Sequence, residues 1–252
     1  MSSNPARSPG SSIANLQIRN GLLAALAPED LSLLAPQLRE TLLMPGDLLH
    51  QPGEKIEQVY FIQSGIVSLM AVLKGGTHVE TASIGREGAI GTIEGFGSLH
   101  AFTCARVQVA GSALRMPGPI FRRTVDGSAS LKESINHYHM SVMAHVQQVT
   151  ACNALHDLTS RLSRILLLSA DRCADDIQLS QESLAEMLGV RRSSVTAAAA
   201  ILRGAGAIEY RRAVIKILDR EKLRSMVCEC YSTIRHTIDV GFNTHPPADV
   251  WA

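Results

Sequence analysis

The sequence has few aromatic residues, no long apolar run and none of the features that mark a secreted or membrane protein. Only 4% of its 252 residues are Phe, Trp or Tyr. No apolar stretch approaches the ~18 residues needed to span a bilayer, and the polar N-terminus, rich in Pro and Ser, lacks the apolar core of a signal peptide. These absences predict a cytoplasmic protein with no membrane partner.

Cysteine is also scarce. Five scattered cysteines do not form a disulfide framework in a chain of this length. They are Cys104, Cys152, Cys173, Cys228 and Cys230. Cys228 and Cys230 lie two positions apart on an expected helix, where their side chains would point to opposite sides and could not hold one ion. The sequence therefore predicts a reducing compartment and no metal site.

The common catalytic motifs are missing. There is no Gly-x-Ser-x-Gly elbow, no phosphate-loop Gly-Lys-Ser/Thr and no His-Glu-x-x-His pair. Gly85, Gly88 and Gly91 do not form a Gly-x-Gly-x-x-Gly loop that opens a helix, and turns explain them better. We therefore expect that the protein is not an enzyme.

The charge that is present divides unevenly along the chain. The net charge is +1, but residues 28–100 hold nine acidic and four basic side chains, a local balance of −5. Residues 189–217 hold six basic side chains and one acidic, a balance of +5. A polyanion such as nucleic acid would therefore be bound by the C-terminal part of the chain.

The pattern of apolar and turn residues predicts an α+β protein. Two short helices, about 21–26 and 28–38, precede a region between 41 and 116 in which turn signals recur every ~8–12 residues, as in a small antiparallel barrel or sandwich. The clearest strands cover 59–62, 66–72 and 105–109. The predicted order is a disordered tail at 1–14, a β-rich domain at 15–127, a long helix at 128–153, a helix-turn-helix domain at 154–232 and a C-terminal tail at 233–252.

The long helix lacks Gly and Pro, and its apolar side chains recur with a heptad spacing. Two parallel helices could bury each other along such a face, although a single helix packed on its own barrel would show the same pattern. His145 on this face is interpreted as a tolerated polar residue rather than a pH sensor. The residues concerned are Leu131, Ile135, Tyr138, Val142, His145, Val149 and Cys152.

The strongest signal in the sequence is a helix-turn-helix between residues 179 and 196. Ser180 can cap a first helix, and Gly189 can end it in the left-handed conformation that a sharp turn requires. Ala185 is small where a second helix must cross, and Val195 is apolar where that helix returns to the core. The expected buried face of the first helix is Leu184, Met187 and Leu188.

The second helix is expected to present a basic face of short side chains, as a helix entering the major groove would. Arg191 and Arg192 lie near its N-terminus, where the macrodipole disfavours cations by roughly 0.3–1 kcal/mol, so a phosphate or a guanine edge is the expected neighbour. A basic hairpin follows at 207–218 as a wing. The arginine pair and the basic hairpin could instead be solvated surface residues that bind no DNA. The predicted DNA contacts are Ser180, Gln181, Arg191, Arg192, Ser193, Ser194, Thr196, Arg203, Arg211 and Arg212.

Residues 22–224 resemble the Crp/Fnr family of bacterial transcription regulators. The N-terminal likeness lies in Pro45–Glu54, Val59–Val67 and Gly85–Gly91, which are similar to the strand-turn units of a cyclic-nucleotide-binding-like domain, and the C-terminal likeness is the winged helix-turn-helix. The resemblance implies a homodimer through the long helix, with double-stranded DNA and RNA polymerase as partners.

The same resemblance argues against cyclic AMP and an iron–sulfur cluster, the two signals that its best-known members bind. Cyclic-AMP-binding members have a glutamate directly after the glycine that matches Gly91 and an Arg-Ser pair about ten residues later, where this chain has Thr92, Phe102 and Thr103. A cyclic phosphate would lose a charge-assisted bond worth roughly 1.5–3 kcal/mol. No cysteine precedes Cys104, so the N-terminal cysteines of iron–sulfur members are missing and no cofactor is expected.

The functional hypothesis is a regulator that binds a roughly palindromic site and responds to another signal, in which an unidentified small molecule is a possible effector. The alternative is a regulatory or scaffolding module whose helix-turn-helix binds a partner protein. The candidate effector-binding residues are Glu80, Arg86, Glu87, Thr92 and Thr103.

Overall fold

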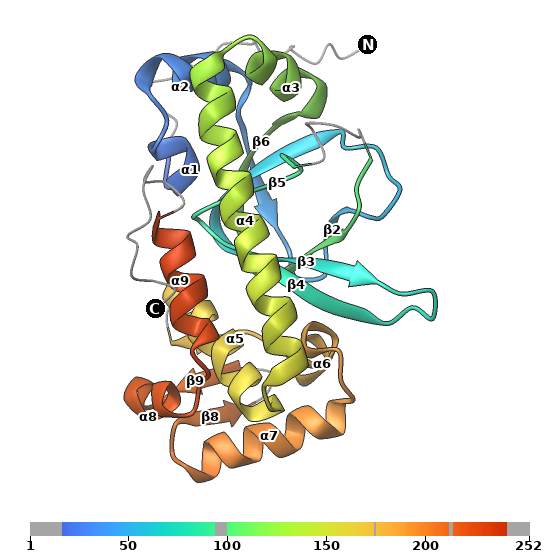
Figure 1. The fold of residues 1–252 in the computed structure, drawn as a ribbon, viewed down its shortest axis with the longest axis vertical. Helices are drawn as coiled ribbons and strands as arrows, with labels where there is room; N and C mark the ends of the chain where they lie inside the picture. The colour runs from blue at the N-terminus through green and yellow to red at the C-terminus, as the bar shows by residue number, and fades with distance from the viewer. Residues whose placement is uncertain (1–16, 94–99, 174, 212–213, 241–252) are drawn as a thin grey trace, which may run out of the picture.

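A computed structural model describes residues 17–93, 100–173, 175–211 and 214–240. A β-rich domain lies at one end of the molecule, a small helical domain lies at the other, and one long helix runs along both (Figure 1). The predicted α+β class is therefore confirmed, whereas the predicted tail at 1–14 lies outside the described residues. None of the described helices is both long and apolar enough to cross a membrane.

The β-rich domain is an antiparallel sheet in the order β1-β6-β3-β4, with β2 paired to β6 and β5 paired to β3. Its strands are β1 (Arg39–Leu43), β2 (Leu48–His50), β3 (Gln58–Val72), β4 (His78–Ile84), β5 (Ala89–Ile90) and β6 (Cys104–Pro117). The two strands predicted at 59–62 and 66–72 form the single strand β3. Gly65 joins them with a φ of +86°, and a Cβ there would lie 2.6 Å from the Val109 carbonyl oxygen.

Short helices close the end of the β-rich domain. The predicted helix at 28–38 is split between α2 (Pro28–Leu34) and a 3-10 turn, η2 (Ala35–Gln37), while α1 (Gly21–Ala24) agrees with the first predicted helix. The sequence reading missed α3 (Gly118–Asp126), which follows β6 and leads into the long helix.

The long helix α4 (Ala129–Leu155) begins at Ser128, whose side chain caps it. The predicted dimer face is wrong, because all seven of its residues are at most 4% exposed within one chain. The first four belong to the same apolar core as the sheet, so the alternative of a helix packed on its own barrel is correct for this face. These residues are Leu131, Ile135, Tyr138, Val142, His145, Val149 and Cys152.

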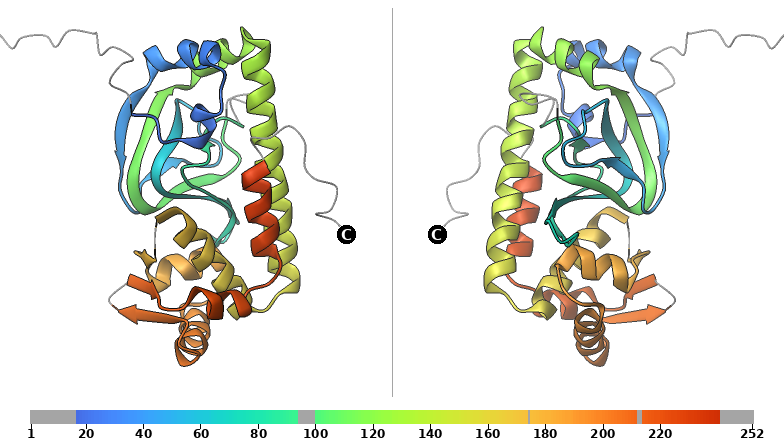
Figure 2. Two further views of the ribbon diagram at one scale, coloured as in Figure 1. Left: turned by 90° about the vertical axis from the view of Figure 1, so that its left-hand side faces the viewer. Right: turned by 90° about the vertical axis from the view of Figure 1, so that its right-hand side faces the viewer.

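The C-terminal domain contains a helix-turn-helix and a three-stranded sheet in the order β7-β9-β8. Its elements are α5 (Leu158–Cys173), β7 (Asp176–Ile177), α6 (Gln181–Leu188), α7 (Arg192–Gly204), β8 (Ile208–Arg211), β9 (Val214–Ile217) and α8 (Arg220–Ser225). A last helix, α9 (Cys230–Val240), lies beside α4 in both views of Figure 2. The predicted tail is therefore wrong for residues 233–240, because Ile234 is fully buried and anchors a further helix, while residues 241–252 lie outside the described residues.

Candidate functional sites

The first helix of the helix-turn-helix begins and ends as its sequence predicts. The Ser180 hydroxyl accepts a hydrogen bond from the Ser183 backbone N–H at 3.0 Å, and α6 ends at Gly189 with a φ of +65°. A Cβ at Gly189 would lie 3.2 Å from a methyl group of Val79 in β4. The glycine therefore serves both the turn and the close packing of α6 on the β-rich domain.

The second helix, α7, buries one face and leaves the opposite face in solvent. The residues predicted to be buried, Val195, Ala199 and Leu202, are at most 8% exposed, and those predicted to point outward are exposed. Arg191 is the N-cap residue, and its side chain makes no capping hydrogen bond to the first amides of α7. The outward residues are Arg192, Ser193, Thr196, Ala200 and Arg203.

The other residues predicted to contact DNA differ in their surroundings. Gln181 and Thr196 are brought together, with 3.0 Å between the Gln181 Oε1 and the Thr196 hydroxyl, while Ser194 is half-buried. On the wing, Arg211 is exposed but pairs with Glu209 at 2.7 Å, an ion pair that the sequence reading missed. Arg212 lies outside the described residues.

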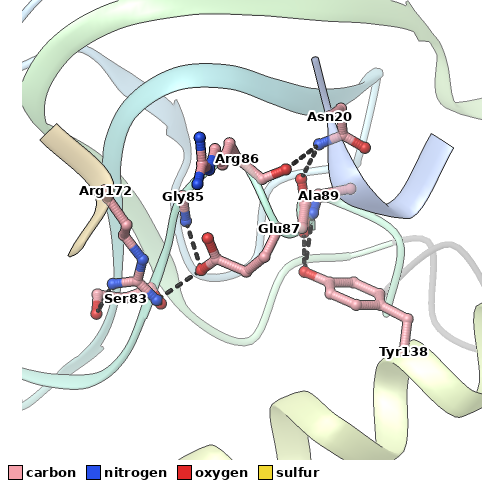
Figure 3. A network of polar contacts seen from close by, with 9 residues as sticks. Asn20, Ser83, Gly85, Arg86, Glu87, Ala89, Tyr138 and Arg172 are labelled. Atoms are coloured by element: carbon pink, nitrogen blue, oxygen red, sulfur yellow. Dashed lines mark hydrogen bonds and ion pairs between the residues drawn. The ribbon is translucent and has the colours of Figure 1, made fainter. Parts of the chain in front are cut away.

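The two acidic candidates for effector binding, Glu87 and Glu80, are both engaged in hydrogen bonds within the protein. The Glu87 carboxylate accepts hydrogen bonds from the Gly85 backbone and from the Arg172 guanidinium on α5 (Figure 3). Glu80 is buried, and its carboxylate accepts a hydrogen bond from the Ser68 hydroxyl. Burial raises the pKa of Glu80, while this hydrogen bond and the charges of Arg164 and Arg172 oppose the rise.

The other three candidates are Arg86, Thr92 and Thr103. Arg86 has an exposed side chain, and its backbone carbonyl accepts a bond from Asn20. Thr92 is buried and its hydroxyl has no hydrogen-bond partner among the described residues, whereas the Thr103 hydroxyl lies 3.5 Å from the His50 Nε2. The structure therefore does not bring the five candidates together around one cavity.

A cavity of about 380 Å³ lies where the β-rich domain meets α5 and α9. Arg86 and Glu87 line it, but Glu80, Thr92 and Thr103 do not. The sequence could not reveal this cavity, because its walls come from segments up to 220 residues apart. Its other charged lining residues are Arg19, Asp171, Arg172, Arg235 and Asp239.

His145 is fully enclosed between α4, the β-rich domain and α5. Burial lowers its pKa well below the usual value, and the charges of Arg172 and Arg164 lower it further. The imidazole is therefore neutral at physiological pH, in agreement with its interpretation as a tolerated polar residue.

The structure also brings together a cluster of sulfur and imidazole groups that the sequence reading dismissed. Cys152 and His156 come from the end of α4, and Cys228 and Cys230 come from the junction of α8 and α9. Cys228 precedes the first residue of α9, so the two cysteines do not share a helix and do not point to its opposite sides as the sequence suggested. The four ligand atoms lie within 4.8 Å of one another.

Two family models match the chain in the order in which the domains occur. Residues 40–128 match the cyclic nucleotide-binding domain, and residues 160–226 match the Crp-like helix-turn-helix domain. The chain belongs to the Crp/Fnr family of transcription regulators. Its helix-turn-helix is therefore of the DNA-binding kind, and its N-terminal domain is of the cyclic-nucleotide-binding type.

Solved structures of other Crp/Fnr regulators share this fold at low sequence identity. FixK2 from Bradyrhizobium japonicum has a TM-score of 0.64 at 15% identity, over 76% of this chain and 98% of FixK2. The c-di-GMP-responsive regulator CLP from Xanthomonas campestris has 0.62 at 15%, over 76% and 99%. A Crp/Fnr regulator from Thermus thermophilus has 0.61 at 19%, over 75% and 97%. No curated protein matches the sequence.

Proposed function

We propose that this Crp/Fnr regulator binds a roughly palindromic DNA site as a homodimer, and that the outer face of α7 reads the bases. The observation that carries this proposal is the exposed row of arginine, serine and threonine side chains on α7. This helix lies at the far end of the molecule from the β-rich domain (Figure 1).

The chemistry of this face suits the major groove. Arg192 and Arg203 can each donate a bidentate pair of hydrogen bonds to a guanine, and the short side chains between them allow the helix to approach the base edges. The amides at the start of α7 lack a side-chain cap, so a DNA phosphate can accept their hydrogen bonds and meet the positive end of the dipole. Arg211 can exchange Glu209 for a phosphate at little cost, because an exposed ion pair contributes roughly 0–1 kcal/mol.

Arginine-to-alanine variants test this function. A DNA site is first selected from a random pool, and affinity is then measured by fluorescence anisotropy over a range of salt concentrations. Arg192→Ala and Arg203→Ala should each weaken specific binding by about ten- to a hundred-fold, as expected for a base contact of ~1–3 kcal/mol. Arg123→Ala, on the exposed surface of α3, is the matched control.

Unchanged affinity in the Arg192→Ala/Arg203→Ala double variant, with the protein still folded, would contradict DNA reading by α7. It would favour the alternative of a scaffolding module that binds a protein partner. On the proposed function, RNA polymerase is the protein partner at the bound site, and the chain catalyses no reaction of its own.

The homodimer is proposed to form through the exposed face of α4, not through the buried face that the sequence suggested. This exposed face has its own heptad spacing, which alternates steps of four and three residues. Met140 and Met143 lie at its centre and are 67% and 52% exposed, which is unusual for large apolar side chains on one helix face. The face consists of Glu133, Asn136, Met140, Met143, Gln147, Thr150 and Ala154.

Charge placed on this face should dissociate the dimer. We expect Met140→Glu with Met143→Glu to convert the protein to monomers in sedimentation velocity, because carboxylates would face each other across a water-excluding contact. Met44→Glu is the matched control, since Met44 is 57% exposed on the β-rich domain. A dimer that survives both methionine substitutions would place the contact elsewhere.

The signal is proposed to be neither cyclic AMP nor an iron–sulfur cluster. The side chains at the positions that would hold a cyclic phosphate do not fit it: Phe102 is 67% exposed, and the Thr103 hydroxyl faces His50. Thr92 offers an uncharged hydroxyl instead of a carboxylate. Cyclic AMP added to the DNA-binding assay is expected to leave the affinity unchanged.

A further inference from the structure

The cluster of Cys152, His156, Cys228 and Cys230 has the composition and the spacing of a metal site. Cys152 and His156 are four positions apart at the end of α4, so one helical turn brings their side chains to the same face. Cys228 and Cys230 approach that face from the loop before α9 and from its first residue.

The distances within the cluster are close to those that one ion would impose. The Cys152 and Cys228 sulfur atoms are 3.6 Å apart, and the Cys230 sulfur lies 3.5 Å from the His156 Nδ1. Around a tetrahedral zinc ion with Zn–S bonds of about 2.3 Å, neighbouring sulfur atoms are separated by roughly 3.8 Å. The side chains would need only small rotations to enclose such an ion.

The groups around the cluster are those that support metal ligands. The His156 Nε2 lies 3.3 Å from the Glu229 carboxylate, which leaves the Nδ1 directed at the sulfur atoms. A carboxylate in this position fixes the orientation of a metal-binding imidazole and increases its basicity. The Gln148 side-chain amide also donates a hydrogen bond to the Cys230 sulfur at 3.0 Å, as is common for a thiolate ligand.

The burial of the cysteines is difficult to explain by packing alone. The three residues form an apolar cluster of their own, separate from the two large cores, and none is more than 9% exposed. A divalent ion supplies the charge that lets buried thiolates form.

We infer that Cys152, His156, Cys228 and Cys230 bind one zinc ion, which fastens the end of α4 to the start of α9. On binding, each of the three thiols releases its proton to solvent, and the Zn(Cys)₃(His) unit has a net charge of −1. Four protein ligands leave no open position, so the site is structural. Sulfur and imidazole ligands select zinc over calcium or magnesium, which prefer oxygen.

The position of the site gives it a clear structural consequence. His156 directly follows the last residue of α4, where the chain passes into α5 and the helix-turn-helix domain. An ion held there would join the helix that runs along the β-rich domain to the helix that ends the described chain. It would thus set the angle between the two domains at their covalent link.

The first experiment measures metal binding by the unmodified full-length protein. Protein purified under reducing conditions from zinc-supplemented medium should contain one zinc per chain by mass spectrometry. After chelation and addition of cobalt(II), it should show a thiolate-to-cobalt charge-transfer band in the near ultraviolet and the visible bands of a tetrahedral ion. Reduced protein that takes up neither metal, or that binds cobalt with an octahedral spectrum, would overturn the inference.

Single substitutions then identify the ligands. Cys152→Ser, Cys228→Ser and Cys230→Ser should each abolish stoichiometric zinc, while Cys104→Ser and Cys173→Ser, which remove cysteines outside the cluster, should retain it. Glu229→Gln should weaken zinc binding by roughly 10–100-fold while keeping the tetrahedral cobalt spectrum. Zinc retained in all three cluster variants would overturn the assignment, as would a Cys152–Cys228 disulfide whose reduction restores no metal binding.

Discussion

Asn20 shows how one buried polar side chain can tie together three parts of the β-rich domain. Its amide donates hydrogen bonds of 2.8 Å to the carbonyls of Ile62 and Gly88, and its oxygen caps α1 through the Leu23 N–H. Replacing it with alanine would leave these buried groups without partners.

We therefore expect Asn20→Ala to lower the free energy of unfolding by about 3 kcal/mol, since each unsatisfied buried group costs roughly 1–3 kcal/mol. Urea denaturation of the purified protein measures this change. Gln37→Ala removes an exposed amide in η2 and should change stability by less than ~0.5 kcal/mol. Equal midpoints for the two variants would show that the Asn20 bonds contribute little.

Whether a helix or strand could be predicted from the sequence depended on how far apart in the chain the residues that define it lie. The helix-turn-helix was predictable, with its caps and buried face, because Ser180, Ala185, Gly189 and Val195 lie within sixteen residues. Strand β3 was predicted as two pieces, because a glycine usually ends a strand and only the neighbouring strand β6 shows that Gly65 continues it.

The long helix shows why a correct pattern can lead to a wrong partner. Its heptad spacing identified the buried face of α4 correctly, but periodicity does not reveal whether a sheet of the same chain or a second chain covers that face. The cluster of cysteines and His156 was missed for a related reason. Cys152 and Cys228 are 76 positions apart, and the helix that was expected to hold Cys228 begins two residues later.

The whole molecule is joined across its two domains by charged groups that neither domain could satisfy alone. Arg172 on α5 donates hydrogen bonds to the Ser83 hydroxyl and carbonyl at 2.8 and 2.9 Å and pairs with Glu87, and its side chain is only 6% exposed. A second ion pair across the domains joins Arg106 of β6 to Glu186 of α6 at 2.9 Å. The β-rich domain therefore contacts both α5 and the first helix of the helix-turn-helix.

Because the buried ion pair of Arg172 and Glu87 joins the two domains, we expect the domains to unfold together. Arg172→Met would leave Glu87, whose side chain is 15% exposed, without its partner cation. Breaking such a buried pair costs about 3–5 kcal/mol of folding free energy. That cost falls on the contact between the domains and not on either core.

Calorimetry should therefore show one unfolding transition for the unmodified protein and two for Arg172→Met. Arg86→Met is the control, because the exposed Arg86 side chain lines the same cavity, and this variant should keep one transition. A single transition at a nearly unchanged temperature in Arg172→Met would mean that apolar contacts alone, such as that of Val79 with Gly189, hold the domains together.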